Sequence, residues 1–181
     1  MSDNHNQPIQ DRIMQNLPRN EQIAKLRDFI DDIDVGMLTT VEADGTLRSR
    51  PMSTARDDSD GTLWFFTDEN SPKVDEIEAT RQVCVSYADP DDSAYVSISG
   101  TASIVTDRAK IEELWHPTLR TWFPKGLDDP RICLLKVEPE KGEYWDAGAS
   151  VLVEVAGLAR ALVTGQGVEN AGENEKIRIE N

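Results

Sequence analysis

The run from residue 48 to residue 52 places two arginines and a methionine at alternate positions. Alternate residues of a β-strand face the same side, so Arg48, Arg50 and Met52 are predicted to share one face. Two guanidinium groups on one face match a phosphate group, because each presents a planar fork of N–H donors. The alternative is a solvated strand face that binds nothing. The run therefore indicates either an anion site or a charged surface strand.

A second anion-binding pattern follows an aromatic run. Thr67 ends the apolar sequence LWFFT, and Ser71-Pro72-Lys73 is typical of a helix start, with serine as the cap and proline at the first position. A helix start attracts anions because its first N–H groups are unpaired and its dipole is positive there. The Ser71 hydroxyl and the Lys73 ammonium would add a donor and a charge. The alternative is helix capping beside a surface lysine.

The hydrophobic periodicity predicts the elements that position these residues. Helices are predicted over 21–32, 71–80 and 106–115, and the run 149–163 favours a helix over a strand. Strands are predicted over 35–41, 47–54, 62–67, 82–87, 94–105, 131–137 and 142–145.

Two of these strands bring the anion-binding patterns together. The strands over 47–54 and 62–67 are expected to be hairpin neighbours, so Arg50 and the Ser71–Lys73 turn are expected to converge on one phosphate. The aromatic run 64–66 offers flat apolar walls beside it. A phosphate site next to such walls suits a phosphorylated flat ring, such as a flavin or a pyridoxal-type ligand.

The number and spacing of the elements indicate the fold class. Six or seven short strands with hairpin turns and inserted helices are typical of an antiparallel barrel or sandwich, α+β and mainly β. The length of 181 residues fits one domain. We expect that domain over 20–165, with a polar segment before it at 1–19 and a polar tail after it at 166–181.

Composition excludes several classes of protein. Lys and Arg number 19 and Asp and Glu number 34, so the net charge is −15; binding to nucleic acid is not expected, because it requires clustered positive residues. No apolar run approaches the ~20 residues of a membrane span, and residues 1–10 lack the pattern of a signal peptide. The sequence therefore predicts a cytoplasmic protein without a membrane partner.

The cysteines and histidines do not form a ligand pattern. Cys84 and Cys133 lie far apart in apolar runs, which predicts two reduced core residues rather than a disulfide. His5 and His116 are also isolated from each other. No metal site and no catalytic triad is therefore predicted.

Four motifs resemble the pyridoxamine 5'-phosphate oxidase-like superfamily, and most closely its general stress protein subfamily of FMN-binding split barrels. They occur in the family's order and spacing: SRPMS, LWFFTDENSPKVDEI, VSISG and DPRICLLKVEPEKGEYWD. The resemblance covers about residues 21–165. It implies a six-stranded antiparallel split β-barrel with peripheral helices, which works as a homodimer. It also implies a cofactor, FMN or in its place FAD, in a groove between the two subunits.

The resemblance also implies site residues. Arg50 corresponds to the family arginine that meets the FMN phosphate and ribityl chain, and Ser71 and Lys73 match the phosphate-binding Ser-x-Lys motif. Pro51 and Met52 would lie along the edge of the isoalloxazine ring.

Three further positions are implied at the flavin ring. Phe66 and Thr67 match the aromatic-Thr pair that ends a strand of the family barrel. Trp145 matches the tryptophan that approaches the flavin from the partner subunit. These residues complete the set that the resemblance assigns to the cofactor.

Departures from the family pattern limit what the resemblance implies about activity. The oxidase has a basic residue where this chain has Pro72 and a glutamine where it has Tyr95, and its Arg-x-His pattern is missing after Trp145. Oxidation of pyridoxamine phosphate is therefore not expected. We expect an FMN-binding flavoprotein of the general stress type, either an oxidoreductase or a non-catalytic flavin carrier, sensor or interaction protein. The sequence assigns no catalytic side chain and no electron donor or acceptor.

Overall fold

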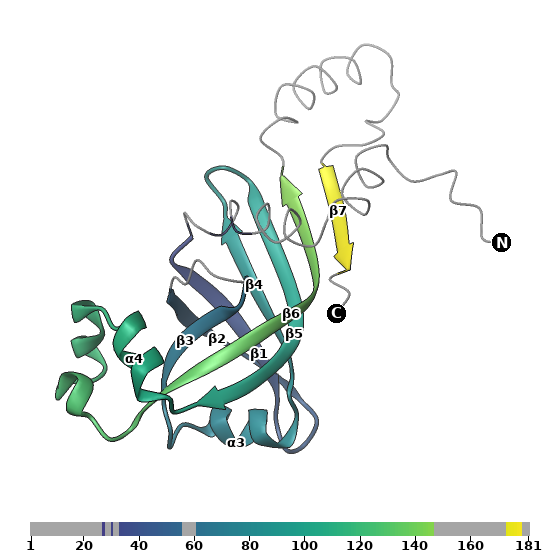
Figure 1. Cartoon of the computed structure of the whole chain (residues 1–181). Helices are drawn as coiled ribbons and strands as arrows, with labels where there is room; N and C mark the ends of the chain where they lie inside the picture. The colour runs from purple at the N-terminus through teal and green to yellow at the C-terminus, as the bar shows by residue number, and fades with distance from the viewer. Residues whose placement is uncertain (1–26, 28–29, 31–32, 56–60, 147–172, 179–181) are drawn as a thin grey trace, which may run out of the picture. The chain divides into compact units, whose positions relative to one another are not determined.

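Six antiparallel strands form a closed barrel. They are β1 (Val35–Val41), β2 (Leu47–Ala55), β3 (Leu63–Asp68), β4 (Gln82–Asp89), β5 (Ala94–Val105) and β6 (Ile132–Asp146). The computed structural model describes residues 27, 30, 33–55, 61–146 and 173–178. Its strand order is β3-β2-β1-β4-β5-β6, and β3 also pairs with β6, which closes the barrel (Figure 1). The prediction of a mainly β split barrel with peripheral helices is confirmed.

Two helices lie between strands, close to where the sequence predicts them. Helix α3 (Pro72–Ala79) has Pro72 at its first position, and helix α4 (Arg108–Leu114) begins after Asp107, whose carboxylate accepts a hydrogen bond from the Ala109 N–H at 2.9 Å. The segment after α4 contains two 3-10 turns, η1 (Pro117–Thr121) and η2 (Gly126–Asp128).

Two other predicted helices fall mainly or wholly on residues that the structure does not describe. Of the helix predicted over 21–32, the described residues are Arg27 and Ile30, and both are helical. The helix favoured over 149–163 lies outside the described residues. None of the described helices is long and apolar enough to cross a membrane.

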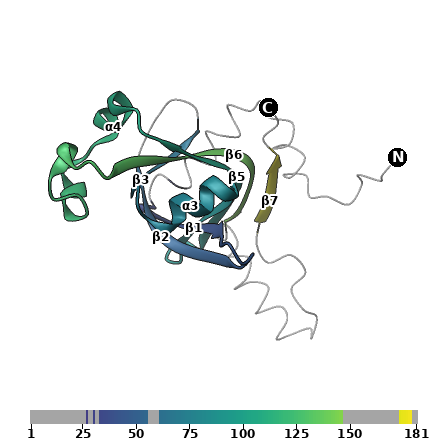
Figure 2. The same ribbon diagram turned by 90° about the horizontal axis from the view of Figure 1, so that it is seen from below.

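Helix α3 closes one end of the barrel. Seen from below, it lies within the ring of strands (Figure 2). Its residues Val74 and Ile77 are buried, as are Leu38, Phe65 and Val85 on the strands. The apolar spacing of three between Val74 and Ile77 explains why this face of the helix packs against apolar side chains. The same packing fixes where the first turn of α3 lies relative to β3.

Segments 34–86 and 98–140 form one compact unit, which contains both anion-binding patterns. Segment 87–97, the end of β6 and the strand β7 (Glu173–Arg178) belong to a second unit. Within the second unit, β7 pairs antiparallel with residues 141–146 of β6. The sequence predicts a polar tail over 166–181, and this strand was not predicted.

The last barrel strand differs from its prediction. The sequence predicts two strands, over 131–137 and 142–145, whereas the structure has one strand over Ile132–Asp146. Residues 132–137 pair with β3 and residues 141–146 pair with β7, so Pro139 falls between the two ladders. A proline lacks an N–H group and cannot donate a ladder hydrogen bond. Because Pro139 lies between the two ladders, it interrupts neither the pairing with β3 nor the pairing with β7.

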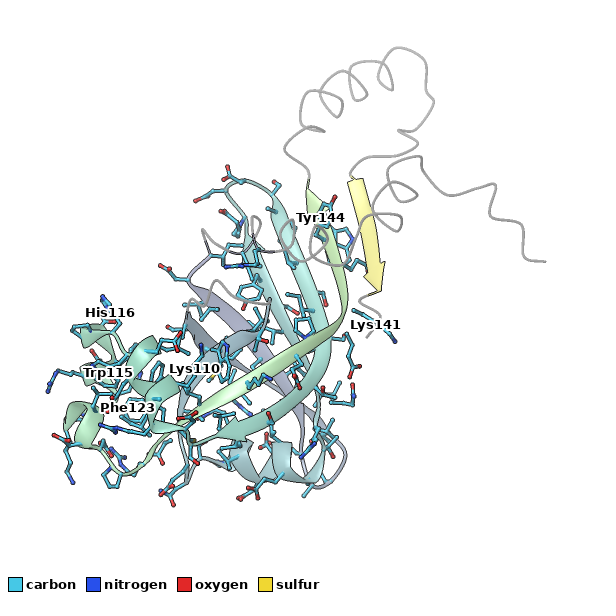
Figure 3. All side chains as sticks on the ribbon, in the orientation of Figure 1. Lys110, Trp115, His116, Phe123, Lys141 and Tyr144 are labelled. Atoms are coloured by element: carbon cyan, nitrogen blue, oxygen red, sulfur yellow. The ribbon has the colours of Figure 1, made fainter. Side chains whose placement is uncertain are left out.

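A second apolar cluster lies outside the barrel, beneath α4 and the two 3-10 turns. Trp64 and Phe123 are buried in it together with Ile132 and Leu134. Trp115 and Phe123 both lie on this segment of the chain (Figure 3). The cluster covers the outer face of β3, so both faces of that strand are buried.

Candidate functional site

Three polar groups meet where β3 ends and α3 begins. The ammonium nitrogen Nζ of Lys73 lies 2.8 Å from Oγ1 of Thr67 and 3.1 Å from Oγ of Ser71, and the two hydroxyl oxygens are 3.3 Å apart. Thr67 is 3% exposed. We call Thr67, Ser71 and Lys73 the hydroxyl–lysine cluster.

The hydroxyl of Ser71 points into this cluster instead of capping the helix. Ser71 occupies the N-cap position of α3 with extended backbone, but its side chain makes no capping hydrogen bond. A serine at this position ordinarily accepts a hydrogen bond from the N–H of the second or third helical residue. The predicted N-cap position of Ser71 is confirmed, but its hydroxyl is directed toward Lys73 and makes no capping hydrogen bond.

The position of Lys73 disfavours its positive charge. Burial lowers the pKa of Lys73 below its ordinary value, and the nearby positive charge of Arg50 lowers it further. An anion that approaches Lys73 would offset both effects, because an opposite charge favours the ammonium form. The influence of Arg50 on Lys73 indicates that the two cations lie within electrostatic reach of each other. Their convergence on one phosphate stays a prediction.

Arg50 itself forms a closed polar network inside the barrel. Its guanidinium donates to Oγ1 of Thr40 at 2.9 Å and to Oε2 of Glu76 at 2.8 Å, and the Thr40 hydroxyl donates to the same carboxylate oxygen. Burial raises the pKa of Glu76, but the hydrogen bonds from Thr40 and Arg50 outweigh it, and the pKa is lowered overall. Glu76 is therefore a carboxylate.

The two arginines of β2 have different environments. The side chain of Arg48 is 60% exposed and pairs with Glu42 at 2.9 Å, whereas that of Arg50 is 17% exposed. The solvated-strand alternative therefore describes Arg48. Arg50 alone is directed toward α3 through its bond to Glu76.

An ion-pair network fixes the turn that leads into the cluster. Arg131 pairs with Asp129 through two nitrogens, at 3.0 and 2.8 Å, and with Asp68 at 2.9 Å. Asp68 in turn accepts from the Asn70 N–H at 2.9 Å. The end of β3 and the start of β6 are thereby joined immediately before Ser71. Neither Asp129 nor Arg131 was singled out from the sequence.

A buried thiol lies next to the cluster. Cys133 is fully buried, and its thiol donates to the backbone oxygen of Thr67 at 3.5 Å. Burial raises the pKa of Cys133 to about 11. The prediction of a reduced core cysteine is confirmed for Cys133; Cys84 is also outside any disulfide but is partly exposed.

The residues predicted at the flavin ring flank a break between two strands. The β2–β3 ladder contains the pairs Thr54–Phe65 and Ala55–Trp64. Residues 50–53 of β2 and residues 66–68 of β3 lie next to this short ladder, on the edges of the two strands that face each other, and they are not paired with each other. Pro51, Met52, Phe66 and Thr67 all lie on these two segments. The structure thus brings the two runs to one opening of the sheet.

The side chains at this opening do not all face one way. Met52 is buried on the face of β2 that also carries Arg50, whereas Pro51 is exposed on the opposite face. Phe66 turns away from Thr67 and packs edge-on against Trp115, with ring centroids 5.8 Å apart.

Trp145 belongs to the second compact unit. It lies on β6 opposite Asn174 of β7 and is partly buried. Its place relative to the hydroxyl–lysine cluster stays a prediction.

Thr40 and Glu76 are the polar residues that sequence reasoning missed. Both are nearly fully buried, and both contact Arg50. Helical spacing gave no signal for Glu76, because it follows Val74 by two residues and precedes Ile77 by one, and residues at those spacings do not share a helix face. Only the docking of α3 in the barrel shows that this glutamate meets the arginine.

The donor set has the chemistry that a phosphate group requires. Two hydroxyl groups and one ammonium converge within 3.3 Å of one another, and a guanidinium lies within electrostatic reach. Phosphate oxygens accept charge-assisted hydrogen bonds from such groups. The residues present therefore fit a phosphorylated ligand.

Comparisons with known proteins agree with this fold. General stress protein 26 of Bacillus subtilis is 31% identical over 138 residues, which cover 72% of this chain and 93% of that protein. A crystal structure of a candidate general stress protein 26 from Jannaschia sp. CCS1 matches with a TM-score of 0.68 and 27% identity, over 88% of this chain and 99% of that one.

A further solved structure is named for its cofactor. It is the general stress FMN/FAD binding protein of Xanthomonas citri, with a TM-score of 0.58 and 26% identity, over 71% of this chain and 90% of that one. The family model described as pyridoxamine 5'-phosphate oxidase like matches residues 21–169. This chain is a member of the pyridoxamine 5'-phosphate oxidase-like family.

Proposed function

We propose that this chain binds a flavin nucleotide, FMN in the first instance, and that Arg50 and the hydroxyl–lysine cluster hold its phosphate group. The observation that carries the proposal is the Ser71 hydroxyl, which makes no capping hydrogen bond and lies beside Lys73. Family membership and the FMN/FAD binding relative support a flavin over other phosphorylated ligands.

The ring of the flavin is proposed to lie along the opening between β2 and β3. Pro51, Met52 and Thr67 would line it there, and Trp145 of the partner subunit would approach it. Phe66 would contribute backbone groups, because its side chain packs against Trp115. A bound flavin supplies hydride or electron transfer, and the protein supplies position and electrostatics.

Titration of flavin-stripped protein tests the proposal. FMN, FAD and pyridoxal 5'-phosphate are added separately, and flavin fluorescence or ligand absorbance is followed. Saturable binding of FMN at about one per subunit is expected, with FMN bound more tightly than pyridoxal phosphate, which lacks the flavin ring. Protein that binds neither flavin would refute the proposal.

A redox role and a carrier role are then separated by one further measurement. We propose that the chain is a flavin-dependent oxidoreductase of the general stress type. The FMN-loaded protein is mixed anaerobically with NADH or NADPH, and bleaching of the flavin absorbance is followed. Bleaching faster than that of free FMN supports the oxidoreductase. Absence of bleaching with both donors, while FMN stays tightly bound, would favour a carrier or sensor.

We also propose that the chain is a homodimer. The outward positions of β1, β2 and β4 form a face without a single charge, although 29% of the whole sequence is charged. Residues that are cross-strand partners lie on the same side of a sheet, so the outward positions of the three strands form one continuous face. They are Val35, Met37, Thr39, Val41, Leu47, Ser49, Pro51, Ser53, Gln82, Cys84 and Ser86. We call them the uncharged face.

Apolar exposure on the uncharged face supports a contact between two copies. Val35 is 46% exposed, Met37 42% and Leu47 73%. Burying such side chains is favourable, and interface centres are depleted of charge. Met37→Glu is expected to shift the mass measured by light scattering from dimer to monomer. Tyr95→Glu, which alters an exposed apolar residue outside this face, should leave the mass unchanged. A wild-type monomer would refute the dimer.

A further inference from the structure

An acidic side chain contacts the arginine that is proposed to meet the phosphate. Glu76 pairs with Arg50 at 2.8 Å, and the two side chains are only 9% and 17% exposed. A buried carboxylate persists when a cation and hydrogen bonds satisfy it, as Arg50 and Thr40 do here. A free guanidinium would attract an anion more strongly than one whose charge is compensated, so Glu76 works against phosphate binding.

We infer that Glu76 is a specificity-determining residue of the phosphate subsite, because it sets how strongly the site prefers a phosphorylated ligand to an unphosphorylated one. Its carboxylate holds the Arg50 guanidinium in place and cancels its charge. Lys73 and Arg50 together bring two positive charges, and Glu76 removes one. The subsite then presents one net positive charge instead of two. This inference rests on the proposed flavin function and deepens it.

Several contacts link the three charged groups. Glu76 lies three residues after Lys73 on α3, so both side chains belong to neighbouring turns of one helix. Arg50 contacts Glu76 directly from β2. Besides burial, which has the largest effect, both Arg50 and Glu76 influence the pKa of Lys73, in opposite directions. A change of charge at Glu76 therefore changes the pKa of the Lys73 ammonium, which contacts Thr67 and Ser71.

The variant Glu76→Gln separates charge from position. Glutamine keeps the length of the side chain and one oxygen that accepts from Arg50 and Thr40, but it carries no charge. Glu78→Gln is the matched control, because Glu78 is exposed on the same helix and its removal changes the net charge by the same amount. The probes are FMN and riboflavin, which share the ring and differ in the phosphate.

Affinities of the three proteins for both probes test the inference. Glu76→Gln is expected to bind FMN about three- to tenfold more tightly than wild type, the effect of one partly screened charge, with riboflavin affinity unchanged. Glu78→Gln should match wild type for both probes. Unchanged or weaker FMN binding by Glu76→Gln would overturn the inference and leave the proposed function standing. Wild-type protein that binds neither probe would refute the proposed function, and this inference with it.

A second pair of variants tests the charge of Glu76 in a protein that lacks the Arg50 guanidinium. Arg50→Gln leaves the Glu76 carboxylate without its cation, so it should lose FMN affinity. Adding Glu76→Gln to that variant removes the repelling charge and should restore part of the FMN affinity without changing riboflavin binding. A double variant that binds FMN no better than Arg50→Gln alone would overturn the inference.

Discussion

The ammonium nitrogen of Lys73 lies 2.8 Å from the hydroxyl oxygen of Thr67, and this contact joins the first turn of α3 to the end of β3. Thr67 lies on the strand that closes the barrel against β6, where it pairs with Cys133, so the β3–β6 ladder fixes its position. The lysine is thereby held at a half-buried position before any ligand binds. A preorganised cation of this kind loses less side-chain freedom on binding than a surface lysine would.

The role of Ser71 is tested by comparing two helix starts. Ser71→Ala should change the free energy of unfolding by less than about 0.5 kcal/mol, because its hydroxyl does not cap α3. Asp107→Ala should cost about 0.5–2 kcal/mol, because Asp107 does cap α4. Chemical denaturation of both variants measures this difference. In the same Ser71→Ala protein we expect weaker FMN binding; a large loss of stability with unchanged FMN affinity would contradict it.

The buried thiol of Cys133 makes stability depend on pH in the alkaline range. Its pKa is raised by burial from 9.0 to about 11. In the unfolded chain the thiol loses its proton at lower pH than in the folded protein, so its contribution to stability is complete below pH 9 and declines as the pH rises toward 11. Denaturation curves of wild type and Cys133→Ala measured across this range check the sign.

The difference between the two proteins isolates Cys133 from other groups that titrate at high pH. The free energy of unfolding of wild type should fall more steeply with pH than that of Cys133→Ala. Equal slopes would show that the thiol titrates alike in both states.

Gly100 is required where β5 passes β6. A Cβ atom at this position would lie 2.2 Å from the backbone oxygen of Glu138. Because the obstructing atom belongs to the backbone, Gly100→Ala should destabilise the protein by about 1–3 kcal/mol or more. Gly45→Asn is the control: a Cβ there meets nothing within 4 Å, and asparagine tolerates its φ of +86°. If thermal denaturation shows the two variants to be equally stable, the close approach at Gly100 is not present in solution.

The barrel could be predicted because its signals are local. The strands over 35–41 and 94–105 have the predicted bounds, since β-branched and apolar residues predominate in them. The strand pair before and after Pro139 was predicted wrongly as two elements. The local sequence does not reveal that β6 is one strand whose first half pairs with β3 and whose second half pairs with β7.

The site was predictable in part for a similar reason. The cluster at Ser71 and Lys73 follows from a helix start, which is a local motif. Glu76 was missed because its contact with Arg50 depends on how α3 docks in the barrel. Trp64, Phe65 and Phe66 could not all face the phosphate, because successive strand residues alternate between the two faces. Trp64 and Phe66 instead pack beneath α4.

The central claim is that the hydroxyl–lysine cluster binds the phosphate of a flavin. Calorimetric titration of wild type and Lys73→Ala with FMN and with riboflavin tests it most directly, with Lys125→Ala as an exposed-lysine control. We expect Lys73→Ala to weaken FMN binding by about 1.5–3 kcal/mol, the effect of a lost hydrogen bond to a charged group, and to leave riboflavin binding and the Lys125→Ala control unchanged. Equal FMN affinity in wild type and Lys73→Ala would contradict the account.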